Sequence, residues 1–173
     1  MKTTICGLLV PMAILVSGSA TAKDEKAVAM LESRSGSTVT GKVTFAQHGG
    51  KVSMKVVVNG LTPRTHAIHL HEKGDCSAPD AASAGGHWNP SSEDHGKWEH
   101  APFHHGDIGN LVADAKGKAE MHLESAIWTI GDGKPSDILG HAVIDHAKED
   151  DFTTQPTGNA GGRVACGVIE RPK

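Results

Sequence analysis

Histidines crowd one stretch of this chain, from residue 66 to residue 107, which holds 8 of the 12 in the sequence. Surface chemistry does not explain such a density. Imidazole nitrogen is a borderline ligand that suits copper and zinc. Residues 73–106 show no clear periodicity and are rich in Gly, Ser, Pro, Asp and His. Loops of that length inside a compact domain are usually functional or disordered. We therefore expect a metal site built from loops on a β scaffold.

Segments in which apolar and polar residues alternate lie on both sides of this stretch. Val39, Val43 and Phe45 alternate with polar side chains, a period of two that is typical of strands. The Asn59-Gly60 dipeptide is a strong turn signal at the end of a later segment. Strands are expected at residues 27–31, 39–45, 52–58, 66–72, 108–113, 119–123, 139–146 and 163–169. A further apolar stretch covers residues 127–130.

The expected strands define the fold class. No convincing long helix interrupts them, and the first three read as an antiparallel meander. The 21 glycines suit short strands and tight turns, and 173 residues suit one domain. The sequence predicts an all-β fold: a Greek-key β-sandwich or flattened eight-stranded barrel. Two long functional loops, residues 73–106 and 147–162, interrupt it.

The first 22 residues have the layout of a secretory signal peptide. Lys2 is followed by a short apolar run, Ile5 to Val16, and then by the small-residue cleavage site Ala20-Thr21-Ala22. The alternative is a membrane anchor, but 12 residues fall short of the ~20 that a spanning helix needs. We expect cleavage after Ala22, a domain at residues 23–173, export to the periplasm or the extracellular space, and no membrane attachment after cleavage.

Charge and composition exclude a nucleic-acid partner. The net charge is −3, the pI is about 6.4, and aromatic residues make up 3% of the chain. A basic face and stacking aromatic side chains are what nucleic-acid binding requires.

Two cysteines remain after residue 22, Cys76 and Cys166. An even count in an exported chain favours a disulfide. Two free thiols or soft metal ligands are the alternative.

The spacing of the ligand candidates indicates two metal ions. His69 and His71 are two residues apart, so both project from one face of a strand. His87 follows two glycines, which let the backbone come close. Zinc accepts three nitrogens and one carboxylate oxygen, and Cu(II) prefers four imidazoles in a flattened arrangement. The candidates are His69, His71, His87, His95, His104, Asp107 and His146.

Together these residues closely resemble the bacterial Cu,Zn superoxide dismutases, over essentially the whole chain after residue 22. Four segments carry the likeness: His-Leu-His-Glu-Lys-Gly-Asp-Cys (69–76), Gly-Gly-His-Trp-Asn-Pro (85–90), His-His-Gly-Asp-Ile-Gly-Asn-Leu (104–111) and Gly-Asn-Ala-Gly-Gly-Arg-Val-Ala-Cys-Gly-Val-Ile (158–169). That set, in this order and at this spacing, is highly specific.

The resemblance implies a role for each candidate. Copper would be bound by His69, His71, His87 and His146. Zinc would be bound by His87, His95, His104 and Asp107. His87 would bridge the ions, and Asp150 would hydrogen-bond the far ring nitrogens of His69 and His95. Cys76 and Cys166 fit the family's disulfide, and Arg163 falls on its guiding arginine.

The resemblance also implies the reaction. The enzyme, an oxidoreductase, would convert superoxide to dioxygen and hydrogen peroxide by alternating reduction and oxidation of copper. The zinc is structural, and His87 would leave the reduced copper and take up a proton. Arg163 would hold the anion by a charge-assisted hydrogen bond. Removal of Lys2 makes the net charge still more negative, so any attraction of superoxide must be local. In the second loop, Lys148 is followed by acidic residues, which weakens any attraction of the anion there. Lys73 and Lys97, in the first loop, could provide the attracting positive charge instead.

Other interpretations stay open. A metal buffer without turnover would not need Arg163 or Asp150, and a copper-only relative would lack the zinc ligands. Homodimer and monomer are both compatible with the sequence. His66 is expected to make a structural hydrogen bond. Five histidines match no family ligand, of which His100 and His105 crowd the zinc loop: His48, His100, His105, His122 and His141.

Overall fold

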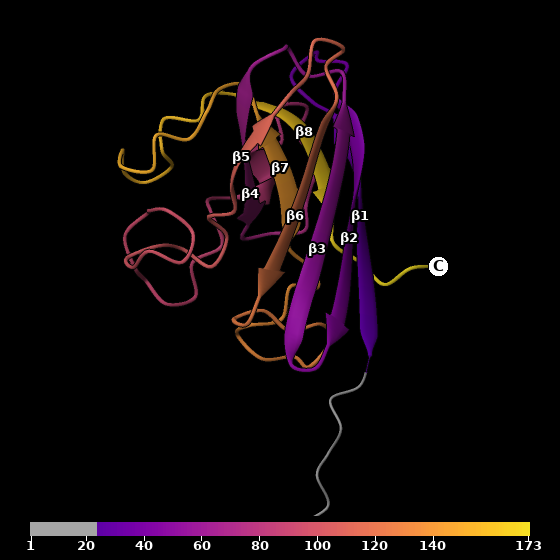
Figure 1. Cartoon of the computed structure of the whole chain (residues 1–173), viewed down its shortest axis with the longest axis vertical. Coiled ribbons are helices and arrows are strands. Elements are labelled where there is room, and N and C mark those ends of the chain that lie inside the picture. Colours follow the sequence, from indigo (N-terminus) through magenta and orange to yellow (C-terminus); the bar gives the residue numbers. More distant parts are fainter. Residues whose placement is uncertain (1–23) are drawn as a thin grey trace, which may run out of the picture.

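The computed structural model describes residues 24–173, and the expected signal peptide at residues 1–22 lies outside them. Eight strands form one antiparallel barrel (Figure 1). The strands are β1 (Glu25–Ser33), β2 (Thr40–His48), β3 (Lys51–Asn59), β4 (Thr65–His71), β5 (Gly109–Val112), β6 (Ala119–Ser125), β7 (Ala142–His146) and β8 (Arg163–Val168). One 3₁₀ turn, η1 (Ala82–Ala84), lies in the first long loop. The all-β prediction is confirmed.

The strand order is that of a Greek-key barrel. Neighbours in the sheet run β5-β4-β7-β8-β1-β2-β3-β6. β1, β2 and β3 form the predicted meander, but β3 then pairs with β6 rather than with β4. The end strands β5 and β6 contact each other without a ladder, so the barrel is nearly closed. This connectivity brings β4 and β7 side by side, although about 70 residues separate them in sequence.

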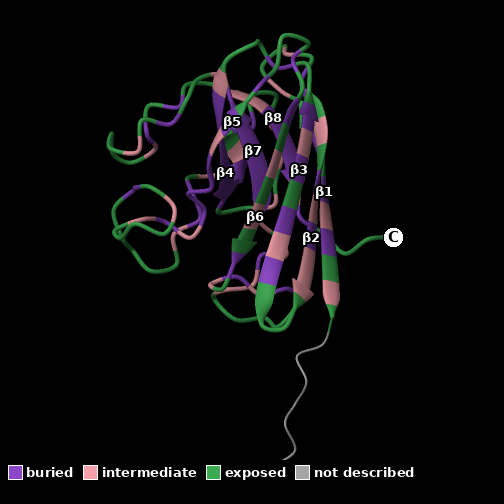
Figure 2. Cartoon of the chain, viewed as in Figure 1, coloured by how far each residue is buried: buried purple, intermediate pink, exposed green. Residues whose placement is uncertain are grey.

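Burial alternates along β1, β2, β3 and β6 and is continuous along β4 and β7 (Figure 2). On β3, Val52, Met54, Val56 and Val58 fill the interior, and the residues between them face outward. The first strands therefore have one face in water. The long loops cover the outer faces of β4 and β7, and this cover is what buries the histidines there.

One expected strand begins too early. The strand predicted at residues 139–146 begins at Ala142, because Leu139 lies in the turn that the Asp137 carboxylate stabilises by accepting hydrogen bonds from backbone N–H groups. The apolar stretch 127–130, to which no element was assigned, lies in a loop. Its Trp128 is buried, packs edge-on against Phe45 and donates a hydrogen bond from Nε1 to the carbonyl of His105. The stretch is apolar because it closes one end of the barrel.

The disulfide between Cys76 and Cys166 is confirmed, and it ties the first long loop to β8. Beneath that loop lies a second, smaller apolar cluster, which includes Ala84, Ile144 and Cys166. The loop is therefore anchored both covalently and by packing on the outer face of the barrel. Among residues 24–173, no helix is long and apolar enough to cross a membrane.

Candidate metal centre

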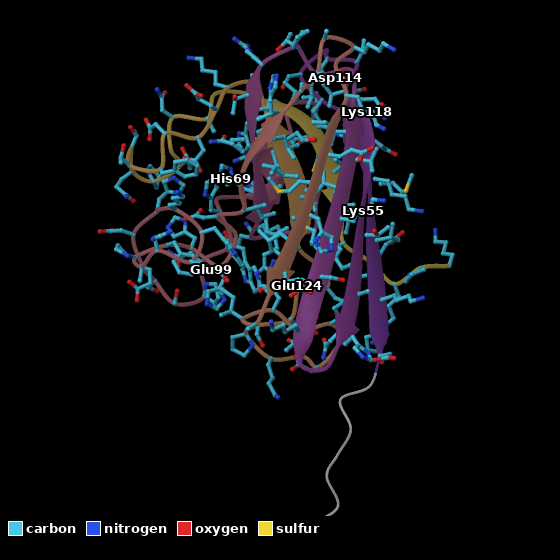
Figure 3. All side chains as sticks on the ribbon, in the orientation of Figure 1. Lys55, His69, Glu99, Asp114, Lys118 and Glu124 are labelled. Atoms are coloured by element: carbon cyan, nitrogen blue, oxygen red, sulfur yellow. A yellow bond between two sulfur atoms is a disulfide. The ribbon has the colours of Figure 1, made fainter. Side chains whose placement is uncertain are left out.

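Two groups of buried side chains converge beside β4. Both long loops leave the barrel on this side (Figure 1), and His69 of β4, labelled in Figure 3, lies there. Within each group, one potential ligand atom per residue lies within 4.8 Å of every other. The first group is His69, His71, His87 and His146, and the second is His87, His95, His104 and Asp107. The seven sequence candidates therefore all meet, and His87 belongs to both groups.

Three ligands of the first group stand on the outer face of paired strands. Ile68 and Leu70 of β4 point into the core, so His69 and His71 must point outward. β7 pairs with β4 through Ile144 opposite His69. The ladder between β7 and β8 shifts register between Asp145 and His146. Such a bulge re-aims a side chain, and Nε2 of His146 lies 3.4 Å from Nε2 of His71.

His87 reaches the same place through the first loop. Its backbone forms an isolated bridge with His71, and the Gly86 carbonyl next to it accepts a hydrogen bond from the Glu72 amide. Gly85 has a φ of 75°, a left-handed conformation that glycine adopts freely. The His87 Nδ1 atom lies 2.8 Å from Oδ1 of Asp107. Its Nε2 atom is buried and has no hydrogen-bond partner among residues 24–173. The centroid of its ring lies 4.0 Å from that of His69, in the first group.

Asp107 organises the second group. One oxygen, Oδ2, accepts hydrogen bonds from the backbone amides of Gly96 and His104, at 3.0 and 2.7 Å. The other, Oδ1, faces three imidazoles. Nδ1 of His95 and of His104 approach it to 3.0 and 3.2 Å without hydrogen-bond geometry. The carboxylate thus has one oxygen fixed by the loop and the other at the centre of the cluster.

Asp150, in the second loop, spans both groups. Its Oδ2 lies 2.8 Å from Nε2 of His69 and its Oδ1 lies 3.0 Å from Nε2 of His95. The carboxamide of Asn110 on β5 holds Asp150 in turn, donating to its carbonyl and accepting from its amide at 2.9 and 2.8 Å. Hydrogen bonds of this kind fix the tautomer and the ring orientation of a metal-binding histidine.

Each ring keeps one nitrogen for the shared centre. The far nitrogens of His69 and His95 face Asp150, and Nδ1 of His71 donates to the Gly85 carbonyl at 3.0 Å. Within the described part of the chain, residues 24–173, these near nitrogens are buried without a hydrogen bond: His69 Nδ1, His87 Nε2, His95 Nδ1 and His104 Nδ1. Buried polar atoms are almost always paired in folded proteins. Such a set of orphaned imidazole nitrogens fits a bound transition-metal ion at each centre.

Burial and the two aspartates, Asp107 and Asp150, set the pKa values of the histidines in this site. Burial, reinforced by neighbouring histidines, holds the pKa of His71 and His146 well below the usual value, and it lowers the pKa of His87 to about 4. Burial also opposes charge on His95, but Asp107 and Asp150 outweigh it and raise the pKa of His95 to about 9. The first group is therefore neutral and ready to coordinate at pH 7, whereas His95 must lose a proton first.

Arg163 stands at the edge of the first group. Its guanidinium donates to the carbonyls of Ala81 and Gly85, each at 2.6 Å. The Gly85 carbonyl is the one that also accepts from His71. A half-buried cation is thus fixed by the first loop close enough to interact electrostatically with His71 and His146.

The remaining histidines lie outside both groups. His66 bridges the carbonyl of His146, at 2.8 Å, and Thr62, the structural hydrogen bond that was expected. His104 rather than its neighbour His105 belongs to the second group. His105 packs against Trp88, and His141 stacks on the same ring. His48, His100 and His122 belong to neither group.

Sequence reasoning missed the two amides that hold the site in place, Asn110 and Gln155. Gln155 makes two hydrogen bonds to the backbone of His95. Asn110 lies within a quoted family segment, so its position there was the available signal. Gln155 has no such signal, because it acts across two loops 60 residues apart in sequence.

Comparison with known proteins identifies the family. The profile described as copper/zinc superoxide dismutase (SODC) matches residues 39–169. A "Superoxide dismutase [Cu-Zn]" of Caulobacter vibrioides is 43% identical over 133 residues, covering 74% of this chain and 75% of its own. A "Superoxide dismutase [Cu-Zn] 2" of Aquifex aeolicus is 34% identical over 169 residues, covering 95% and 98%.

An animal relative and a solved structure agree. An "Extracellular superoxide dismutase [Cu-Zn]" of Drosophila melanogaster is 41% identical, covering 76% of this chain and 75% of its own. The crystal structure of the clock protein EA4 superposes with a TM-score of 0.78 at 37% identity, covering 89% of this chain and 99% of that one. The chain belongs to the copper/zinc superoxide dismutase family of oxidoreductases, and copper and zinc are its cofactors.

Proposed function

We propose that the two groups divide the cofactors of this superoxide dismutase as follows. Copper is held by His69, His71, His87 and His146, a set of four imidazoles, and zinc by His87, His95, His104 and Asp107. The donor chemistry supports this division, since four nitrogens suit Cu(II) and a three-nitrogen, one-oxygen set suits structural zinc. The membership of His87 in both groups carries the proposal.

The protein's residues provide geometry, charge and protons. When bound, copper would supply the transfer of one electron between two superoxide anions. His87 would offer one ring nitrogen to each ion. When its Nε2 is not coordinated, that atom would hold a proton for the peroxide product. Nδ1 keeps that ring in place on the Asp107 side. Arg163 binds and orients the anion by charge-assisted hydrogen bonding.

A buffer without turnover is less compatible with these observations. Arg163 is fixed by two short hydrogen bonds beside the copper group rather than directed at a carboxylate. Asp150 orients one ligand of each ion. Storage of metal requires neither arrangement.

Metal content and dismutation rate of the purified, oxidised protein test the proposal together. One copper and one zinc per chain and rapid dismutation are expected. His87→Ala should lose most of the activity, whereas His122→Ala, at an exposed histidine outside both groups, should match the wild type. Two bound metals with no turnover, or full activity in His87→Ala, would contradict the proposal.

The proposal also covers the export of the protein and its oligomeric state. We infer that residues 1–22 direct the chain to the periplasm or the extracellular space, where a disulfide such as Cys76–Cys166 persists. Mass spectrometry of the exported protein should find Lys23 at its N-terminus, and a chain retained in the cytoplasm at full length would refute this. All seven candidate ligands come from one chain, so both a monomer and a homodimer would have complete sites.

A further inference from the structure

Gln155, in the second loop, is hydrogen-bonded to the backbone of the candidate zinc ligand His95. Its Oε1 accepts a hydrogen bond from the His95 amide and its Nε2 donates one to the His95 carbonyl, both at 2.8 Å. His95 lies outside every strand, so no sheet ladder fixes its backbone. Among residues 24–173, no other hydrogen bond to its amide or carbonyl is formed. The position of its backbone therefore depends on one side chain from a different loop.

The same loop holds the ring of His95. Asp150 Oδ1 lies 3.0 Å from its Nε2. Gly158 packs so closely over this contact that a Cβ atom there would collide with Asp150 Oδ1 and lie 2.7 Å from His95 Nε2. Residues 150–158 thus hold His95 at three points: amide, carbonyl and far ring nitrogen. The near nitrogen, Nδ1, is the one directed at Asp107.

We propose that Gln155 is a positioning residue for the zinc ion, which locks His95 in its ligating orientation and so slows zinc release. The inference rests on the proposed function, in which His95 binds zinc. A ligand whose backbone and ring are both fixed does not lose conformational freedom when the ion binds, and it cannot swing away without breaking several hydrogen bonds. Mutation of a residue that orients a metal ligand commonly lowers metal affinity by about 10–100-fold.

The loop contains a matched control. Thr154 is the neighbour of Gln155 and donates a hydrogen bond from Oγ1 to Asp151 at 2.6 Å. Among residues 24–173, the hydrogen bonds of His95 are to Gln155 and Asp150 and not to Thr154. Thr154→Ala removes a hydrogen bond from the same loop without touching the zinc ligand. Gln155→Met keeps the length of the side chain and removes both hydrogen bonds. Gln155→Glu keeps an acceptor for the His95 amide and loses the donor to its carbonyl.

The experiment measures zinc dissociation from the copper- and zinc-loaded proteins into a chromogenic chelator, together with the visible spectrum of Co²⁺ substituted at the zinc site. Gln155→Met should release zinc about 10-fold faster and alter the Co²⁺ bands, with Gln155→Glu intermediate. Thr154→Ala should stay within about twofold of the wild type in rate and keep its spectrum.

The inference is overturned if Gln155→Met releases zinc at the wild-type rate, or if Thr154→Ala accelerates release equally, since the loop alone would then be responsible. The wild type separates this failure from that of the proposed function. Wild-type protein that binds zinc and dismutates superoxide, with no effect at Gln155, refutes only the positioning role. Wild-type protein that takes up no zinc or Co²⁺ refutes the zinc assignment itself.

Discussion

Replacing Asp145 with valine should stabilise this protein. Asp145 lies on β7, one residue before His146, but its side chain is on the opposite face. It is fully buried, and neither carboxylate oxygen has a hydrogen-bond partner among residues 24–173. Its neighbours across the ladders, Ile68 and Ala165, belong to the apolar core. Burial raises the pKa of Asp145 from its ordinary value of 3.8 to about 7.

The magnitude follows from that shift. A pKa difference of about three units corresponds to about 4 kcal/mol of lost stability once the carboxyl is ionised, at 1.36 kcal/mol per unit. Between about pH 4 and pH 7 the unfolded chain gives up this proton and the folded protein keeps it. Stability therefore falls as the pH rises through that window and levels off above it. Valine has no such titration, is favoured in strands, and adds apolar contacts.

Urea unfolding of the metal-free, disulfide-intact protein at pH 5 and pH 8 would measure the effect. At pH 8, Asp145→Val should be more stable than the wild type by about 3–4 kcal/mol, or roughly 6–16 °C in Tm. The advantage should be about 3 kcal/mol smaller at pH 5. Asp145→Asn, which removes the charge and keeps a polar group, should show the same pH trend with a smaller gain. An advantage that does not change with pH, or a less stable valine variant, would refute the reasoning.

Four further outcomes are expected. His146→Ala should lower dismutation at least about 100-fold while zinc content stays normal, and retained activity would refute the copper assignment. Asp107→Ala should weaken zinc binding at least about 100-fold and lower the Tm, so unchanged zinc content would point to other ligands. Arg163→Glu should slow dismutation about 10-fold or more with copper still bound, and an unchanged rate would exclude guidance of the anion. Zinc uptake by the metal-free protein should release about one proton at pH 7 and almost none at pH 10, because His95 has a pKa of about 9 and His87 one of about 4. Calorimetry in buffers of different ionisation enthalpy would measure this, and a release that does not vary with pH would contradict it.

The sequence predicted what depends on local pattern. The strand expected at residues 52–58 is present and alternates in burial, and the one expected at residues 139–146 is present from Ala142 onward. The seven candidate ligands could be named without coordinates, because their spacing and their family likeness identify them. The structure brings all seven together. The apolar run 127–130 could not be assigned from the sequence, since a loop that closes a barrel end has the composition of a strand.

Long-range polar contacts could not be predicted in the same way. The pairing of Gln155 with the His95 backbone has no periodicity and no motif, because it exists only when two loops meet. The free-energy cost of burying the Asp145 carboxylate could not be predicted from the sequence either. Adjacent residues of a strand point to opposite faces, so Asp145 and His146 must face different sides. Only the assembled barrel shows that the Asp145 side is closed to water.

The central claim is that one imidazole joins two different ions. Diffraction from crystals of the loaded protein, recorded at the copper and zinc absorption edges, would test it most directly. The account predicts a copper signal among His69, His71 and His146, a zinc signal among His95, His104 and Asp107, and the His87 ring bound to both in the oxidised protein. A single metal species at both positions after loading with equimolar copper and zinc, or a His87 ring bound to neither ion, would contradict it.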